Sequence, residues 1–220
     1  MNRDEKNETQ DRREAWQRKV AACTAAIQEA PMSADGYTRR GQAYYEMGHM
    51  QMALRDFTRA IELEPATSEG FVNRAFAYGG VGRHDLAAAD ATRAIELESG
   101  CSTAYSVRGM AAKEMGRLEE AVEDLTAAME LSPERLSPRM DRARIYIRWG
   151  FFEQAEADFS QCIELDPTEA EAYRGRAIAR GRLGRIAQAK RDADTYIRLG
   201  AGIPLWLIEA LGNHERETRL

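Results

Sequence analysis

A period of thirty-four residues organises this chain. Segments of similar pattern begin at Ala34, Ser68, Ser102, Leu136 and Ala170. If the first residue of each segment is place 1, five places are identical in all five copies: arginine at 7, glycine at 15, alanine at 20, aspartate at 23 and leucine at 30. A fixed period of this length is typical of stacked supersecondary units, so it constrains the architecture more than any single residue does.

Each segment has the pattern of a helical hairpin. In the first copy, apolar residues recur at helical spacing over 37–45 and again over 53–63. Gly48 lies between these stretches, where a glycine with positive φ would end the first helix and open a short turn. Pro65 follows the second stretch and would stop it, because proline lacks the N–H and clashes with the preceding turn. The sequence therefore predicts an all-α chain of hairpins.

The pattern of small and aromatic residues resembles that of a known family. An aromatic at places 4, 11 and 24, a small residue at 8, alanine at 20 and 27, and proline at 32 resemble the tetratricopeptide repeat. The first copy fills every slot, with Tyr37, Gly41, Tyr44, Ala53, Phe57, Ala60 and Pro65. Later copies depart in part, since Ala91 and Ala193 replace the aromatic at place 24 and Arg180 stands at place 11. The resemblance covers about residues 15–201 and implies a right-handed α-solenoid.

The repeats set the domain organisation. We expect five full repeats at 34–67, 68–101, 102–135, 136–169 and 170–201. Residues 15–33 match a second helix, because Val20, Cys23 and Ile27 occupy the places of Leu54, Phe57 and Ile61, and they predict a half repeat after a polar tail at 1–14. Residues 203–220 predict a capping helix with a polar tail, since the end of a solenoid needs a covering element.

Composition and charge narrow the class of protein. With 44% hydrophobic and 30% charged residues, the chain has an ordinary soluble composition. A net charge of −5 argues against nucleic acid as a partner. The polar start lacks the apolar run of a secretory signal, and no stretch is long enough to span a bilayer. We therefore expect a cytoplasmic protein without a membrane partner.

The residues that could carry chemistry favour a scaffold over an enzyme. An active site would need the arginine at place 7 and the aspartate at place 23 once, whereas five copies suit an ion pair inside every hairpin. The three histidines and three cysteines have no metal-ligand spacing. No phosphate loop or nucleophile elbow is present. The sequence therefore predicts a non-enzymatic protein without a metal or cofactor.

The resemblance also implies where a partner binds. In tetratricopeptide arrays the first helices line a concave groove for a peptide or protein segment. Carried onto this chain, that groove is lined by Arg39, Gln42, Tyr45, Val72, Asn73, Phe76, Val107, Met110, Met140, Arg144, Ile147, Arg148, Arg174, Ile178 and Arg182. Apolar side chains exposed in a groove usually mark a binding surface. The charges make the groove weakly acidic in the first three repeats and basic in the last two.

The basic part of this groove suggests the kind of partner. Guanidinium groups at Arg144, Arg148, Arg174 and Arg182 suit the carboxylates of an acidic segment. The alternative is that they are solvated or paired with Asp141 and Glu171. We therefore predict a non-enzymatic adaptor. The competing hypothesis is a structural protein that forms homo-oligomers through its half repeat or its capping helix.

Overall fold

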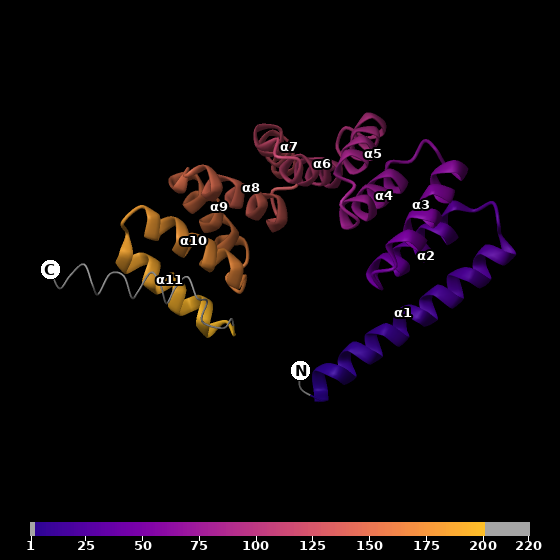
Figure 1. The fold of residues 1–220 in the computed structure, drawn as a ribbon, viewed down its shortest axis with the longest axis horizontal. Helices are drawn as coiled ribbons and strands as arrows, with labels where there is room; N and C mark the ends of the chain where they lie inside the picture. Colours follow the sequence, from indigo (N-terminus) through magenta and orange to yellow (C-terminus); the bar gives the residue numbers. More distant parts are fainter. Residues whose placement is uncertain (1–2, 201–220) are drawn as a thin grey trace. The chain divides into compact units, whose positions relative to one another are not determined.

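The computed structural model describes residues 3–200, and side chains from residue 14 onward. This part of the chain holds eleven α-helices and no strand (Figure 1). After α1 (Arg3–Glu29) come five hairpins: α2 (Ala34–Glu46) with α3 (Met50–Leu63), α4 (Ser68–Gly80) with α5 (His84–Leu97), α6 (Ser102–Glu114) with α7 (Leu118–Leu131), α8 (Leu136–Trp149) with α9 (Phe152–Leu165), and α10 (Ala170–Arg182) with α11 (Ile186–Arg198). The predicted all-α helical solenoid is confirmed. The capping helix expected at 203–220 lies outside the described residues.

The helices form two compact units. Unit 1 is Met1–Leu131 and contains α1 to α7, while unit 2 is Ser132–Leu220 and contains α8 to α11. Within each unit, every helix packs against the next one in the chain.

A left-handed glycine ends the first helix of every hairpin. Gly48, Gly82, Gly116, Gly150 and Gly184 have φ values of 75°, 75°, 78°, 80° and 73°. A side chain would strain the backbone there, which explains why place 15 never varies within the chain. In the first hairpin the turn is closed by the N–H of His49, which donates to the carbonyl oxygen of Tyr44 at 2.8 Å.

In four of the five hairpins the residues at places 8 and 24 match in size, whereas in the fourth the ring of Phe159 lies against Gly175 of the next hairpin. A Cβ on Gly41 would lie 2.6 Å from the ring of Phe57, so only glycine leaves room for that ring. Gly109 faces Leu125 in the same way, at 3.1 Å. Where place 24 is small, place 8 carries a methyl group instead, as in the pairs Ala75 with Ala91 and Ala177 with Ala193, all of which are buried. The departures from the aromatic pattern are therefore compensated inside the same hairpin.

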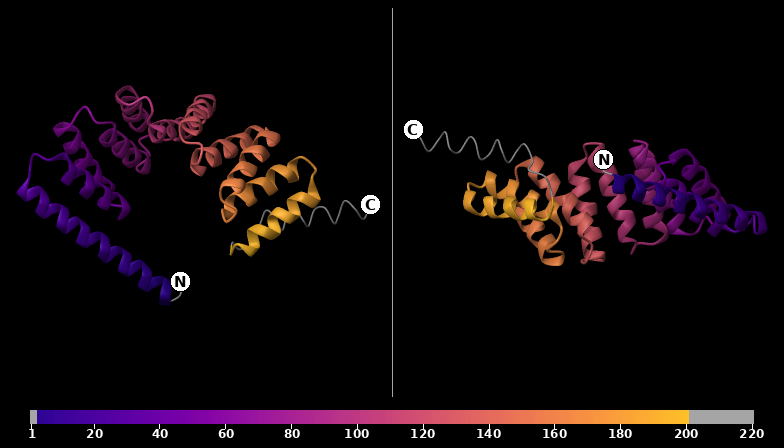
Figure 2. Two further views of the ribbon diagram at one scale, coloured as in Figure 1. Left: turned by 180° about the vertical axis from the view of Figure 1, so that it is seen from behind. Right: turned by 90° about the horizontal axis from the view of Figure 1, so that it is seen from below.

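The first helix is longer than the sequence led us to expect. Figures 1 and 2 show α1 as one unbroken helix that runs from Arg3 through the expected polar tail and into the half repeat. Residues 3–14 contain no proline or glycine and are rich in Arg, Glu, Lys and Gln, which have high helix propensity. α1 packs against α2, where the missing side chain of Gly36 makes room for Ile27.

Candidate partner-binding surface

The invariant arginines and aspartates form ion pairs inside all five hairpins. In each pair the Nε and Nη2 atoms of the arginine donate to the two carboxylate oxygens of the aspartate at 2.7–3.0 Å. The pairs are Arg40 with Asp56, Arg74 with Asp90, Arg108 with Asp124, Arg142 with Asp158, and Arg176 with Asp192. The aspartates are buried, so these residues belong to the scaffold as the sequence predicted.

These arginines also reach the second helix of the preceding repeat, as four of them illustrate. Their Nη1 atoms donate to hydroxyl groups sixteen residues earlier in the chain, at 3.2–3.5 Å: Arg40 to Thr24, Arg74 to Thr58, Arg108 to Thr92, and Arg176 to Ser160. Aromatic rings flank the guanidinium groups, with those of Tyr37 and Tyr44 lying 5.8 and 6.0 Å from Arg40. Each of the four therefore ties three helices together.

Hydrogen bonding to the carboxylates also affects ionisation. It raises the pKa of Arg40, Arg74 and Arg108 above the usual arginine value, although burial acts in the opposite direction. The guanidinium groups therefore stay charged across the whole working pH range. Sequence reasoning missed their hydroxyl partners, although threonine or serine recurs sixteen residues before each of these arginines.

The first helices of unit 1 enclose two hollows that share a wall. The first, of about 370 Å³, is lined by Trp16, Lys19, Gln42, Tyr45, Glu46, Phe57, Asn73 and Phe76. The second, of about 330 Å³, is lined by Tyr45, Phe76, His84, Val107, Met110, Lys113, Glu114 and several alanines and glycines. Tyr45 and Phe76 belong to both. We call this continuous surface the α2–α4–α6 groove.

The groove contains six of the eight residues that the resemblance implied for unit 1: Gln42, Tyr45, Asn73, Phe76, Val107 and Met110. Arg39 lies beside it and pairs with Asp35 on its own helix at 2.8 Å. The amide nitrogen of Asn73 is buried and has no hydrogen-bond partner among the described residues, so it is an unsatisfied donor in the groove wall.

Three of the apolar residues that we expected to be exposed in the groove are buried. Val72, Val107 and Met140 are 8%, 4% and 5% exposed. Val72 packs with Ile61 and Phe71, and Met140 belongs to a core cluster of unit 2. These side chains face the packed side of their helices, so the expectation of exposure was wrong. Val107 still contributes to the floor of the second hollow.

Sequence reasoning missed the contribution of α1 to the groove. Trp16 and Lys19 line the first hollow, although they precede the five full repeats. A signal was present, because Lys19 stands at the place that is alanine in all five repeats. A long cationic side chain at that place indicates a surface that no first helix covers.

In unit 2 the predicted arginine cluster separates into two kinds of residue. Arg144 pairs with Asp141 at 3.1 Å, and Arg174 pairs with Glu171 at 2.8 Å. The alternative that these arginines are internally paired is therefore correct for both. Arg148 and Arg182 are exposed and have no ion-pair partner within the described part of unit 2. Ile147 and Ile178 on the same helices are half-buried.

The described residues contain neither a candidate metal site nor a candidate membrane span. Within 3–200, no three His, Cys, Asp or Glu side chains are grouped so that they could hold a metal ion. None of the described helices combines the length and the apolar character needed to cross a membrane.

Comparisons with known proteins agree with the repeat pattern. Family models described as tetratricopeptide repeat match residues 34–66, 102–135 and 139–169. No curated protein sequence matches the chain.

Solved structures share the fold at low sequence identity. YrrB, described as a TPR protein with an unusual peptide-binding site, is 18% identical, with 89% of this chain and 99% of YrrB covered at a TM-score of 0.66. The pilF protein of Pseudomonas aeruginosa is 18% identical, with 83% and 86% covered at a TM-score of 0.73. MamA from Desulfovibrio magneticus RS-1 is 17% identical, with 76% and 94% covered at a TM-score of 0.67. Together with the family models and the hairpin geometry, these neighbours lead to one conclusion: the chain is a tetratricopeptide repeat protein.

Proposed function

We propose that this protein is a non-enzymatic adaptor that binds a segment of a partner protein in the α2–α4–α6 groove of unit 1. The observation that carries the proposal is the pair of adjoining hollows, whose shared wall consists of Tyr45 and Phe76. Tetratricopeptide repeat proteins commonly bind proteins or peptides, and YrrB is described as having a peptide-binding site. The expectation of a cytoplasmic location stays a prediction.

The groove offers both apolar contact and hydrogen bonding to such a segment. Met110 is 38% exposed, and Tyr45 and Phe76 are half-buried, so a partner that covers them would remove apolar surface from water. The amide of Gln42 in the wall of the first hollow could bond to the main chain of the partner. An apolar wall with a few fixed polar groups is the usual make-up of a binding site.

An acidic stretch of the partner would suit unit 2. Arg148 on α8 and Arg182 on α10 occupy the same place in successive repeats and are the two members of the predicted cluster that form no ion pair with a described residue. Their guanidinium groups are free to pair with carboxylates.

Affinity capture from a lysate of the source organism tests the groove. The groove variant carries Phe76→Ala and Met110→Ala. A matched control carries Phe151→Ala and Met52→Ala, which remove the same residue types from positions outside the groove that are 47% and 43% exposed. We expect the groove variant to lose proteins that both the wild type and the control retain. An identical set of captured proteins from all three would overturn the proposal.

Self-association is the second candidate, and one feature of α1 favours it. Ala22 and Ala26 are exposed on α1, whereas Asp56 and Ala60 at the same places of α3 are buried beneath α2. This face of the half repeat could pack on another copy of the chain. Light scattering over a hundredfold range of concentration decides the matter, and a constant monomer mass would eliminate this candidate.

A further inference from the structure

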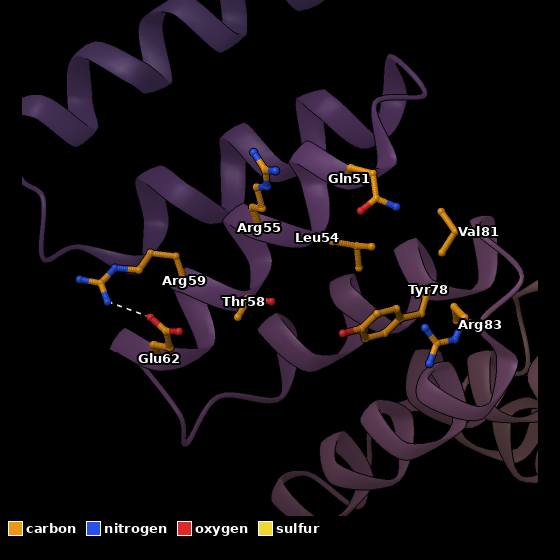
Figure 3. A pocket seen from close by; sticks show the side chains of 9 residues that line it. All are labelled: Gln51, Leu54, Arg55, Thr58, Arg59, Glu62, Tyr78, Val81 and Arg83. Carbon is orange, nitrogen blue, oxygen red and sulfur yellow. Dashed lines mark hydrogen bonds and ion pairs between the residues drawn. The ribbon is translucent and has the colours of Figure 1, made fainter.

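A third hollow of unit 1 lies on the side of the second helices and shares no residue with the α2–α4–α6 groove. It has a volume of about 560 Å³ and is lined by Gln51, Leu54, Arg55, Thr58, Arg59, Glu62, Tyr78, Val81 and Arg83. Figure 3 shows the α3 residues along one side of the hollow, with Tyr78, Val81 and Arg83 facing them from the end of α4 and the turn that follows. The six α3 residues recur at helical spacing and therefore form one stripe of that helix.

This hollow has an excess of positive charge in a chain whose net charge is −5. It contains three arginines and one glutamate. Glu62 is engaged by Arg59 at 2.9 Å, on the helix that both share (Figure 3). Arg83 has a longer contact of 3.5 Å with Asp85, and both side chains are more than half exposed. Arg55 has no ion-pair partner among the described residues, so Arg55 and Arg83 are the cations available to a ligand.

The next repeat provides an internal comparison. Thirty-four residues later, a hollow of about 570 Å³ has the same position between α5 and the turn after α6. There Ala89 replaces Arg55 and Ala112 replaces Tyr78, while Thr92 and Arg117 match Thr58 and Arg83. That second hollow also contains Glu120, Glu123 and Asp124. The fold therefore requires neither the guanidinium group of Arg55 nor the ring of Tyr78, since the same hairpin geometry forms with alanine at both places.

We propose that the hollow beside α3 binds an acidic segment of a protein partner. The guanidinium groups of Arg55 and Arg83 each pair with a carboxylate, for which their planar donor geometry is suited. Leu54, Tyr78 and Val81 supply apolar contact to the side-chain methylene groups of the ligand, and the amide of Gln51 supplies a hydrogen bond. The volume exceeds the space that one small oxyanion needs, so an extended peptide fits the hollow better than free phosphate does.

Fluorescence anisotropy with the full-length protein tests this site. The probe is a fluorescein-labelled decaglutamate peptide, and a decaglutamine peptide reports binding that does not depend on charge. The site variant carries Arg55→Ala and Arg83→Ala. The matched control carries Arg93→Ala and Arg117→Ala, which changes the net charge equally one repeat further along. Circular dichroism is expected to show that both variants fold, because alanine already stands at the place of Arg55 in the next repeat.

We expect the site variant to weaken decaglutamate binding about tenfold, roughly threefold for each exposed pairing, and the control to change the Kd less than twofold. Binding should also weaken steeply with salt, because the charges lie at an open surface. An equal loss in both variants, or equal binding of decaglutamine, would overturn the proposal.

Two further arms separate other sources of the signal. The first arm adds inorganic phosphate or sodium sulfate at constant ionic strength. If phosphate displaces the probe at concentrations where sulfate has no effect, the hollow binds phosphate and the proposal of a peptide ligand is overturned. Loss of binding in a variant with Arg148→Ala and Arg182→Ala, with no loss in the site variant, would move the acidic ligand to unit 2. Neither result bears on the α2–α4–α6 groove, which Phe76→Ala and Met110→Ala test independently.

Discussion

At the scale of single residues, the arginine at place 7 carries the most structural information. The sequence predicted its ion pair with the aspartate because both residues recur in every copy. Sequence reasoning did not predict its second contact, since the hydroxyl partner lies in the preceding repeat and changes from threonine to serine at Ser160. A polar network of this kind is costly to break when its members are buried.

The ion pair between Arg74 and Asp90 should be measurable in stability. The side chains are 17% and 11% exposed. Hydrogen bonds to charged groups contribute about 1.5–3 kcal/mol, so Asp90→Asn should lower the free energy of unfolding by about 2 kcal/mol in chemical denaturation. Glu96→Gln is the control, because Glu96 forms an exposed pair with Arg93 that should contribute less than about 1 kcal/mol. Equal losses in the two variants would contradict the assigned role.

The cysteines should differ in reactivity. Burial raises the pKa of the Cys162 thiol to about 11, and its side chain is inaccessible. Since a thiol reacts as the thiolate, Cys162 should resist alkylation in the native protein at pH 8, and the denatured chain should react rapidly. Cys101 is partly exposed and should react in the native state. Mass spectrometry of peptides after a timed exposure to iodoacetamide distinguishes them, and rapid native labelling of Cys162 would contradict the burial.

At the scale of helices, the sequence predicted the hairpins well because glycine and proline specify where a helix ends. It did not explain why the aromatic at place 24 is missing from three copies, which carry Ala91, Leu125 and Ala193 instead. The structure explains this through packing. Each large side chain at place 24 faces a glycine, which lies in the same hairpin for Phe57 and Leu125 and in the following hairpin for Phe159. Each alanine at place 24 faces another alanine in the same hairpin. The size of the residue at place 24 depends on the residue that faces it, so a pattern that treats each place separately does not predict it.

Gly41 and Phe57 should therefore be strongly coupled. Gly41→Ala should destabilise the protein by about 1–3 kcal/mol because the new methyl group overlaps the ring of Phe57. The double variant Gly41→Ala with Phe57→Ala recreates the pair found in the second repeat. It should be more stable than the sum of the single effects predicts, by more than about 0.5 kcal/mol in a double-mutant cycle. Additive effects would show that the two residues do not share the same space.

At the scale of the whole molecule, the thirty-four-residue period was sufficient to predict the fold. The resemblance placed the groove of unit 1 at six residues that do line it, but it also included Val72 and Met140, which are buried. The reason is physical: a place number fixes the position of a residue around the helix, whereas burial also depends on how closely the neighbouring helices approach. The repeat pattern did not predict the contribution of α1, because Trp16 and Lys19 precede the first full repeat.

The two compact units lead to a prediction about truncation. Residues 1–131 contain α1 to α7 with their mutual contacts, and stability in repeat proteins comes from each repeat and its nearest neighbours. A fragment of residues 1–131 should therefore keep its helical circular dichroism and unfold cooperatively. We also expect this fragment to bind decaglutamate with the affinity of the full chain. A fragment that is unfolded at 20 °C would contradict the division of the chain into two compact units.

The distance along the chain between each arginine and its partners affects how the gene for a repeat protein can gain or lose repeats. Arg74 contacts Asp90 sixteen residues ahead and Thr58 sixteen residues behind, so its contacts span nearly one period. A tandem duplication of one whole period creates a junction at which the hydroxyl, the guanidinium and the carboxylate are again correctly spaced, wherever the copied stretch begins. An insertion between Thr58 and Asp90 that is not a whole number of periods separates them. Recombination between repeats can thus add or remove units of this array while every product keeps a complete set of contacts.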